Sequence, residues 1–159
     1  MGAIRNSTLS AEDDSLTERI IGAALTVHRA LGPGLLEGLY QKALGVELAG
    51  AVLAVRREVA VPVVYHGTLL GEQRLDLIVA GRVIVELKAV EALAQVHRAQ
   101  LLTYLRVSGL PIGLLLNFGT EQLQVRRLLN TPNKQFSVPS SLRPSVLRPD
   151  LDPHQIPVP

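Results

Sequence analysis

The chain has 159 residues, of which 47% are hydrophobic and only 3% aromatic, with no cysteine and a formal net charge of +2. This length allows one domain with an aliphatic core, and the lack of cysteine excludes disulfides, thiolate metal sites and cysteine nucleophiles. The composition suits a reducing compartment and shows no signal peptide or membrane-spanning run, so we expect a cytoplasmic protein.

Three regions differ in composition and predict the domain organisation. Residues 1–14 are short, polar and acidic, and we interpret them as a flexible leader. Residues 15–129 carry nearly all of the periodic apolar pattern and are expected to form the domain. Residues 130–159 contain seven of the ten prolines and predict an extended tail, because proline cannot continue a helix or a central strand.

Apolar residues at helical spacing predict two helices at the start of the domain. The first should end at Gly32-Pro33-Gly34, with Ser15 or Thr17 as its N-cap. The second is expected over residues 35–49, with Gly50 as its C-terminal stop. Its apolar stripe should consist of Leu36, Leu39, Tyr40, Ala43 and Val46.

The elements that follow are mostly strand-like. A third helix is expected over residues 91–108. Strands are expected at residues 52–65 with a bend at Pro62, at 72–79, 83–89 and 111–118, and at an edge position over 123–129. This order predicts an α/β sandwich whose sheet has mixed strand directions, rather than a doubly wound parallel sheet.

Two neighbouring strands carry the residues that indicate a reaction. Side chains two positions apart along a strand share a face, so Glu86 and Lys88 should project together. On the preceding strand, Asp76 should lie on the face opposite to that of its apolar neighbours. The apolar residues expected to pack on the other face are Leu75, Leu77, Val79, Val83, Val85 and Leu87.

The register between these strands decides whether the two acids meet. If Val79 pairs with Val83 across a three-residue loop, Asp76 lies directly opposite Glu86 on the same face. With a two-residue loop, Asp76 would instead oppose an apolar residue and the packing faces would disagree. The apolar pattern therefore favours the register that brings the carboxylates together.

Two adjacent carboxylates repel each other unless a cation lies between them or one is protonated. Mg²⁺ suits such a site, where it would polarise a phosphoryl oxygen and activate a water. Lys88 is one of only three lysines, and it would orient that water or stabilise the developing negative charge. The alternative is an acid–acid–lysine salt-bridge cluster on an exposed sheet face, which the apolar surroundings make less favourable.

Further polar residues lie on the expected helices. His97, Gln100 and Tyr104 are spaced to share one helix face, where they would either position a phosphate or water, or face solvent. Glu37 shares a face with Tyr40 beside the apolar stripe. An acid in a first turn is also favoured by the helix dipole, so both readings of Glu37 stay open on the residues alone.

Together, these segments resemble the GxxExxY proteins, a group of small bacterial and archaeal proteins within the PD-(D/E)xK nuclease superfamily. The naming motif is present as Gly34-x-x-Glu37-x-x-Tyr40, and the likeness covers about residues 15–129. It continues through Arg74-x-Asp76, Glu86-Leu-Lys88-Ala-Val, Ala99-Gln100-Leu-Leu-x-Tyr104-Leu and Gly113-Leu-Leu-Leu-Asn117-Phe118-Gly119. The combination in this order is specific, whereas E-x-K alone is not.

The resemblance implies a restriction-endonuclease-like α/β fold, in which helices flank a central mixed sheet. It implies that Asp76 and Glu86 hold a metal, with the backbone carbonyl of Leu87 as a further ligand. It matches Lys88 to the catalytic lysine of the superfamily and Glu37 to an additional helical acid beside the metal.

The resemblance also matches Gln100 and Tyr104 to the Q-x-x-x-Y signature of RecB-type nucleases, which organises the site and engages nucleic acid. Arg74, Arg98 and Arg106 are candidate phosphate contacts, although for any single one of them a solvated-surface role is favoured.

We therefore expect a Mg²⁺-dependent nuclease, with Mn²⁺ as a substitute, that hydrolyses phosphodiester bonds of DNA or, less favoured, RNA. The alternative is a non-catalytic nucleic-acid- or protein-binding module on the same fold. No membrane partner is expected, and self-association is left open.

Overall fold

The computed structural model describes residues 9–131, and within them no helix combines the length and apolar character needed to cross a membrane. The helices are α1 (Ala11–Leu31), α2 (Glu37–Gly50) and α3 (Gln95–Ser108). The strands are β1 (Val55–Tyr65), β2 (Thr68–Val79), β3 (Val83–Lys88), β4 (Ile112–Asn117) and β5 (Gln124–Leu129).

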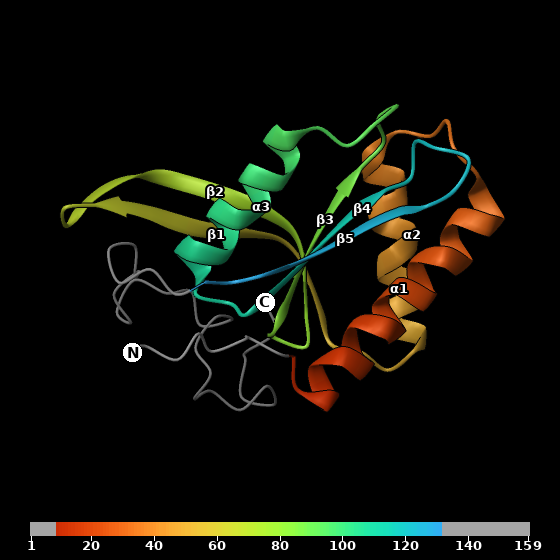
Figure 1. Cartoon of the computed structure of the whole chain (residues 1–159), viewed down its shortest axis with the longest axis horizontal. Coiled ribbons are helices and arrows are strands. Elements are labelled where there is room, and N and C mark those ends of the chain that lie inside the picture. Colours follow the sequence, from red (N-terminus) through yellow and green to blue (C-terminus); the bar gives the residue numbers. More distant parts are fainter. Residues whose placement is uncertain (1–8, 132–159) are drawn as a thin grey trace, which may run out of the picture.

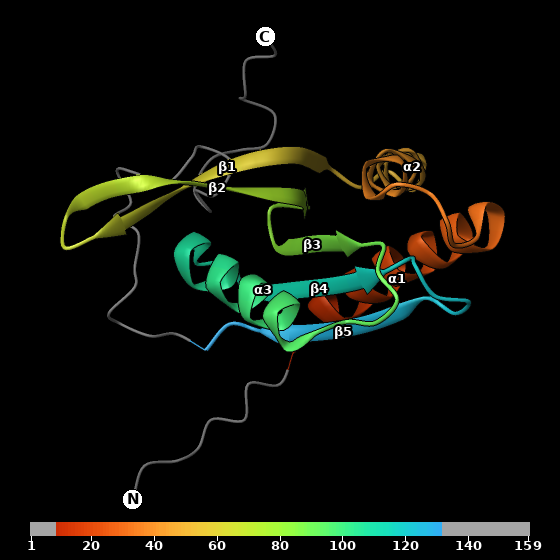
Figure 2. The same cartoon turned by 90° about the horizontal axis from the view of Figure 1, so that it is seen from above.

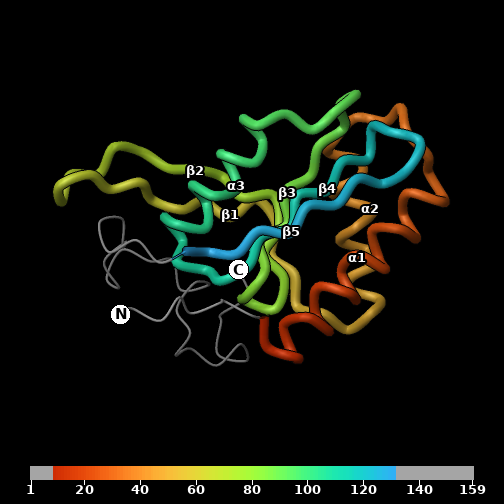
Figure 3. Tube along the Cα trace, in the orientation of Figure 1, coloured from red at the N-terminus to blue at the C-terminus, as the bar shows by residue number. Residues whose placement is uncertain are grey.

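The five strands form one mixed sheet in the order β1-β2-β3-β4-β5. Strands β3 and β4 are parallel, whereas the other neighbours are antiparallel. A parallel pair needs a long crossover, and α3 provides it. Figures 1 and 3 show α3 on one side of the sheet and α1 and α2 on the other. The expected α/β class with mixed strand directions is confirmed.

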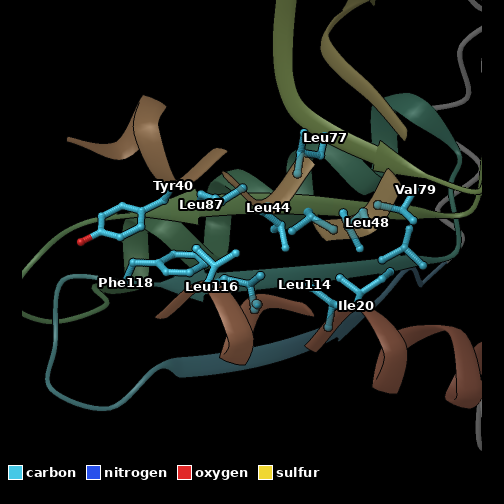
Figure 4. Packing of buried hydrophobic residues seen from close by; sticks show 14 of the residues in the cluster. Ile20, Tyr40, Leu44, Leu48, Leu77, Val79, Leu87, Leu114, Leu116 and Phe118 are labelled. Atoms are coloured by element: carbon cyan, nitrogen blue, oxygen red, sulfur yellow. The ribbon is translucent and has the colours of Figure 1, made fainter. Parts of the chain in front are cut away.

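Buried apolar side chains form two clusters, one on each face of the sheet. The larger cluster lies between the sheet and α1 and α2, and Figure 4 shows its side chains interlocking. In it, the rings of Tyr40 and Phe118 stack with centroids 4.7 Å apart. The smaller cluster packs Leu101 and Leu105 of α3 against Ile84 of β3. Because strand side chains alternate, β3 contributes to both clusters.

The β1–β2 hairpin projects beyond the rest of the sheet (Figure 2). Its outer part is a two-stranded ribbon that turns at His66 and Gly67, both of which have positive φ. Tyr65, Leu69 and Leu70 near the tip are exposed. The two strands continue from this ribbon, with a register shift at Val63 and Val64, into the body of the sheet, where β2 meets β3.

Helix α1 begins earlier than expected, at Ala11, and the predicted N-caps Ser15 and Thr17 are wrong. The hydroxyl of Ser10 accepts the backbone N–H of Asp13 at 3.1 Å and so caps the helix. Arg82 donates two hydrogen bonds to the Asp13 carboxylate, at 2.6 and 2.8 Å. Residues 11–14, which we placed in the leader, are therefore the first turn of α1.

The other end of the domain also extends slightly beyond its predicted boundary. The side chain of Asn130, a residue that we placed in the tail, donates to the carbonyls of Leu105 and Leu110 at 2.9 and 3.0 Å. These bonds tie Asn130 to the last turn of α3 and to the loop between α3 and β4. The rest of the predicted tail from residue 132 onward lies outside the described residues.

The apolar stripe predicted for α2 is partly wrong. Tyr40, Leu44 and Leu48, spaced four residues apart, are fully buried, whereas Leu36 and Val46 are 78% and 71% exposed. The helix offers more apolar residues than the sheet covers, so apolar content alone did not identify the buried face.

Two further predicted boundaries are wrong because of local backbone geometry. Val52, where we expected a strand to begin, has a φ of 59° and lies 91% exposed in the turn after α2. The third helix starts four residues late, at Gln95, because residues 89–94 form a bent connection after β3.

Candidate active site

The register between β2 and β3 is the one that brings the two acids together. Val79 pairs with Val83 and Leu77 with Val85, so Asp76 follows directly opposite Glu86. The expected packing of β3 is confirmed, since Leu87 lies in the cluster under α1 and α2. On β2, however, Leu75 lies in the α3 cluster instead of the one predicted.

The departure at Leu75 lies beside a backbone irregularity on the neighbouring strand. Glu58 of β1 lies opposite Asp76, between the paired residues Arg57–Leu77 and Val59–Leu75, and its φ is 53°. A left-handed residue interrupts the alternation of side chains along its own strand, so β1 does not keep one face through this point.

The carboxylate of Asp76 is fixed in place by the neighbouring strand. Its Oδ2 accepts the backbone N–H of Leu87 at 2.9 Å. Burial raises the pKa of Asp76, although the Leu87 N–H and the Lys88 ammonium oppose that shift by stabilising the ionised form.

Glu86 and Lys88 form a nearly buried ion pair on the same face of β3. The Lys88 Nζ lies 3.1 Å from Oε1 of Glu86, and the two side chains are 13% and 4% exposed, respectively. Within the described residues, Oε2 of Glu86 is the buried side-chain atom that has no hydrogen-bond partner. A buried carboxylate oxygen without a donor is costly, so this atom is available to a ligand.

The charges of this cluster act strongly on one another. Burial and the adjacent Asp76 carboxylate raise the pKa of Glu86 to about 7. Burial would lower the pKa of Lys88, but attraction to Glu86, Glu37 and Asp76 raises it instead. The lysine therefore stays protonated at neutral pH, whereas Glu86 is divided between its two forms.

Glu37 lies in the first turn of α2, where the residue as a whole is exposed. Partial burial of its carboxylate raises its pKa, and its charge interacts with those of Lys88 and Asp76. The other motif residue, Tyr40, is fully buried; its hydroxyl donates to the carbonyl of Gly32 and accepts the N–H of Leu35 at 3.1 Å. The GxxExxY segment is thus a braced turn that presents Glu37.

The polar face expected on α3 is only partly present. Gln100 Nε2 donates to the Tyr104 hydroxyl at 2.6 Å, and burial together with the nearby Glu86 charge raises the pKa of Tyr104. His97 has a different role from the one predicted, because its Nδ1 accepts the backbone N–H of Ala94 and caps the helix.

The three arginines expected to contact phosphate have different surroundings. Arg74 lies 3.8 Å from the Glu58 carboxylate, and both side chains are largely exposed. Arg106 donates to the carbonyl of Leu102 on its own helix, and Arg98 is exposed. Their roles as phosphate contacts stay predictions.

Sequence reasoning missed Gln41 and Glu58. Gln41 lies one turn after Glu37 on α2, and its amide donates to the backbone carbonyl of Asp76 at 2.9 Å and to Glu58 at 2.8 Å. The spacing of four from Glu37 was the available signal for Gln41. The left-handed conformation of Glu58 had no signal in the sequence.

The donor set fits a hard divalent cation. Among residues 9–131 no group of three or more histidine, cysteine, aspartate and glutamate side chains lies close enough to hold a metal by itself. Mg²⁺, however, retains several waters and commonly binds through one or two carboxylates. Asp76 and Glu86 meet that need, and the unpartnered Oε2 of Glu86 offers a free ligand atom.

Comparisons with known proteins agree with this geometry. A family model described as the PD-(D/E)XK nuclease superfamily matches residues 14–128. The crystal structure of SSO0001 is similar in fold, with a TM-score of 0.51 and 17% identity; the similarity covers 76% of this chain but only 61% of that one. No curated protein matches the sequence significantly. Because the family model spans most of the chain, the protein belongs to the PD-(D/E)XK nuclease superfamily.

Proposed function

We propose that this protein is a metal-dependent nuclease that hydrolyses phosphodiester bonds, with DNA as the preferred substrate and RNA as the second. Superfamily membership implies a nucleic-acid substrate and a divalent metal in general terms. The observation that carries the proposal is the convergence of Asp76, Glu86 and Lys88, with one oxygen of Glu86 buried and unpartnered.

Asp76 and Glu86 would hold the cation, which we propose to be Mg²⁺ with Mn²⁺ as a substitute. The Leu87 carbonyl and Glu37 are proposed as further ligands, directly or through water. Bound there, the cation would supply Lewis-acid polarisation of a phosphoryl oxygen and a lowered pKa of a water. The raised pKa of Glu86 suits this role, because a cation held there would displace its proton.

The remaining steps fall to side chains of this chain. Water attacks phosphorus, the bond from phosphorus to the leaving sugar oxygen breaks, and that oxygen takes up a proton. The Lys88 ammonium is held at the carboxylates, where it can donate to the attacking water and to the oxygens on which negative charge develops. The Gln100–Tyr104 pair on α3 would position the phosphate beside it.

We further propose that the protein is a GxxExxY member of the superfamily. Two observations support this placement: Tyr40 braces the turn that begins the motif, and the charge of Glu37 interacts with those of Lys88 and Asp76. Within the motif, Tyr40 therefore fixes the conformation of the turn, and Glu37 contributes a negative charge.

The test is a cleavage assay with the full chain, using single- and double-stranded DNA and RNA with Mg²⁺, Mn²⁺ or EDTA. We expect cleavage that requires the metal and is lost in Glu86→Gln, which keeps the size of the side chain. Lys42→Ala, a change at an exposed lysine, is the control. Metal-independent binding without cleavage, equal in Glu86→Gln, would instead support the binding module and contradict the nuclease.

A further inference from the structure

Asn117 is a fully buried polar residue at the end of a strand whose other residues are buried and almost all apolar. It is paired with Lys88 in the parallel β3–β4 ladder, so the two side chains leave the sheet next to each other on the same face. Burying a side-chain amide costs on the order of several kcal/mol unless each of its polar atoms forms a hydrogen bond. The hydrogen-bond partners of Asn117 therefore identify the part of the chain that it stabilises.

The bonds of Asn117 converge on the chain just after Lys88. Its Oδ1 accepts the N–H of Val90 at 3.0 Å, and its Nδ2 donates to the carbonyl of the same residue at 2.9 Å. Oδ1 also accepts the N–H of Gly119 at 3.1 Å, and Nδ2 donates to Gln124 of β5 at 3.0 Å. One side chain thus replaces the sheet partners that Val90 would otherwise need.

Two neighbours of Asn117 complete the same contact. The backbone N–H of Phe118 donates to the carbonyl of Lys88 at 2.8 Å. A Cβ atom on Gly119 would lie 2.5 Å from the backbone N and O of Val90, so any side chain there would push Val90 away. The φ of Gly119 lies outside the left-handed region, which means that close approach rather than conformation requires glycine.

We propose that Asn117 and Gly119 form a clamp on the exit of β3 and act as positioning residues for Lys88 and for the Leu87–Lys88 backbone. Residues 89–94 have no regular structure of their own, so without the clamp the end of β3 is free to fray. The Lys88 ammonium would then lose its fixed distance to Glu86. The first test of this proposal measures cleavage, and to that extent the proposal rests on the nuclease function.

A matched control is available elsewhere in the fold. Asn130 is likewise an asparagine whose side-chain amide donates to backbone carbonyls, here those of Leu105 and Leu110, but it braces the last turn of α3 and the loop that follows it. A merely structural role for Asn117 predicts that Asn117→Ala and Asn130→Ala lose stability and leave turnover of the folded protein unchanged.

The experiment compares Asn117→Ala, Gly119→Ala and Asn130→Ala in the full chain, with kcat and KM measured on a DNA oligonucleotide in Mg²⁺. We expect kcat to fall about 10- to 100-fold in the first two variants, with KM little changed, because a small displacement of a catalytic group costs this much. Asn130→Ala should keep the wild-type kcat. Wild-type kcat in Asn117→Ala and Gly119→Ala, or an equal loss in Asn130→Ala, would overturn the clamp.

A second readout does not depend on cleavage. Reductive methylation with ¹³C-formaldehyde labels the amines of Lys42, Lys88, Lys134 and the N-terminus, and arginine variants assign the three lysine NMR signals. In metal-free protein, the Lys88 signal should move toward the position of the exposed Lys42 in Asn117→Ala and Gly119→Ala only. If the wild type cleaves nothing, the nuclease proposal fails and this signal alone decides: a shift supports the clamp, and no shift in either variant overturns it. Should Asn117→Ala not fold, Gly119→Ala decides in the same way.

Discussion

The backbone N–H of Leu87 donates a 2.9 Å hydrogen bond to the carboxylate of Asp76, and this bond joins the two acidic strands at the candidate site. The bond crosses from β3 to β2 at the point where the regular ladder ends. Each carboxylate thus has one donor, the Leu87 N–H for Asp76 and the Lys88 ammonium for Glu86, but within the described residues the second oxygen of Glu86, Oε2, is buried without a hydrogen-bond partner. The asymmetry leaves Glu86 as the carboxylate that depends most on a cation.

Replacing Lys88 should remove cleavage without unfolding the protein. In Lys88→Ala the charge that would stabilise the transition state is lost, and we expect kcat to fall about 10²- to 10³-fold. Lys42→Ala, at an exposed position of α2, should keep wild-type activity. Equal activity in Lys88→Ala and the wild type would remove the lysine from the mechanism.

The metal-free protein should lose stability as pH rises through neutrality. The folded-state pKa of Glu86 is about 7, above the ordinary value of 4.5, so its contribution is fully present below about pH 4.5 and is lost as pH rises through 7. The size of that loss is on the order of 3 kcal/mol. Thermal melts in EDTA from pH 5 to pH 8 measure it.

The matching variant for this pH dependence is Glu86→Gln, which cannot ionise. Its melting temperature should change much less between pH 5 and pH 8 than that of the wild type. The raised pKa values of Asp76 and Glu37 act in the same direction, so some dependence should persist. A wild type whose stability rises over this range would contradict the burial of an ionisable Glu86.

The Asp13–Arg82 pair should contribute measurably to stability. Its two short hydrogen bonds tie the first turn of α1 to the β2–β3 loop, and the Asp13 side chain is 10% exposed whereas Arg82 is half exposed. Charged hydrogen bonds of this kind contribute about 1 kcal/mol after allowing for that exposure. Urea unfolding of Asp13→Asn, Arg82→Gln and the double variant should give a coupling energy of that size, and additive effects would argue against the contact.

Removing the hydroxyl of Tyr40 should loosen the turn before α2 and leave the core intact. In Tyr40→Phe the ring still stacks on Phe118, but the carbonyl of Gly32 and the N–H of Leu35 lose their partner. We expect a loss of about 1–2 kcal/mol in the free energy of unfolding. Amide hydrogen exchange should increase at Leu35, while unchanged protection there would show that the brace is unimportant.

The pairing of Asp76 with Glu86 was predictable because one register alone kept the apolar residues of β2 and β3 on a common face. This prediction rests on the alternation of apolar residues along the two strands, which is visible in a single sequence. Leu75 shows its limit, since it packs in the α3 cluster beside the irregular backbone of Glu58, and no residue type indicates that left-handed conformation.

The supports of the site were less predictable than its acids. Asn117 and Gln41 act through side-chain hydrogen bonds to backbone atoms that are distant in sequence, and such contacts leave no periodic pattern. The start of α1 was missed because acidic residues 12–14 suggested a solvated leader, although acids also favour a helix N-terminus and Ser10 precedes them.

The central claim is that Asp76 and Glu86 together bind a divalent cation, and diffraction at the manganese absorption edge from a crystal soaked in Mn²⁺ tests it most directly. We predict an anomalous peak within about 2.1 Å of an oxygen of each carboxylate, the distance typical of such hard cations. The Glu86→Gln protein should show a weaker peak. A well-ordered wild-type site with saturating Mn²⁺ and no anomalous peak between the two carboxylates would contradict the account.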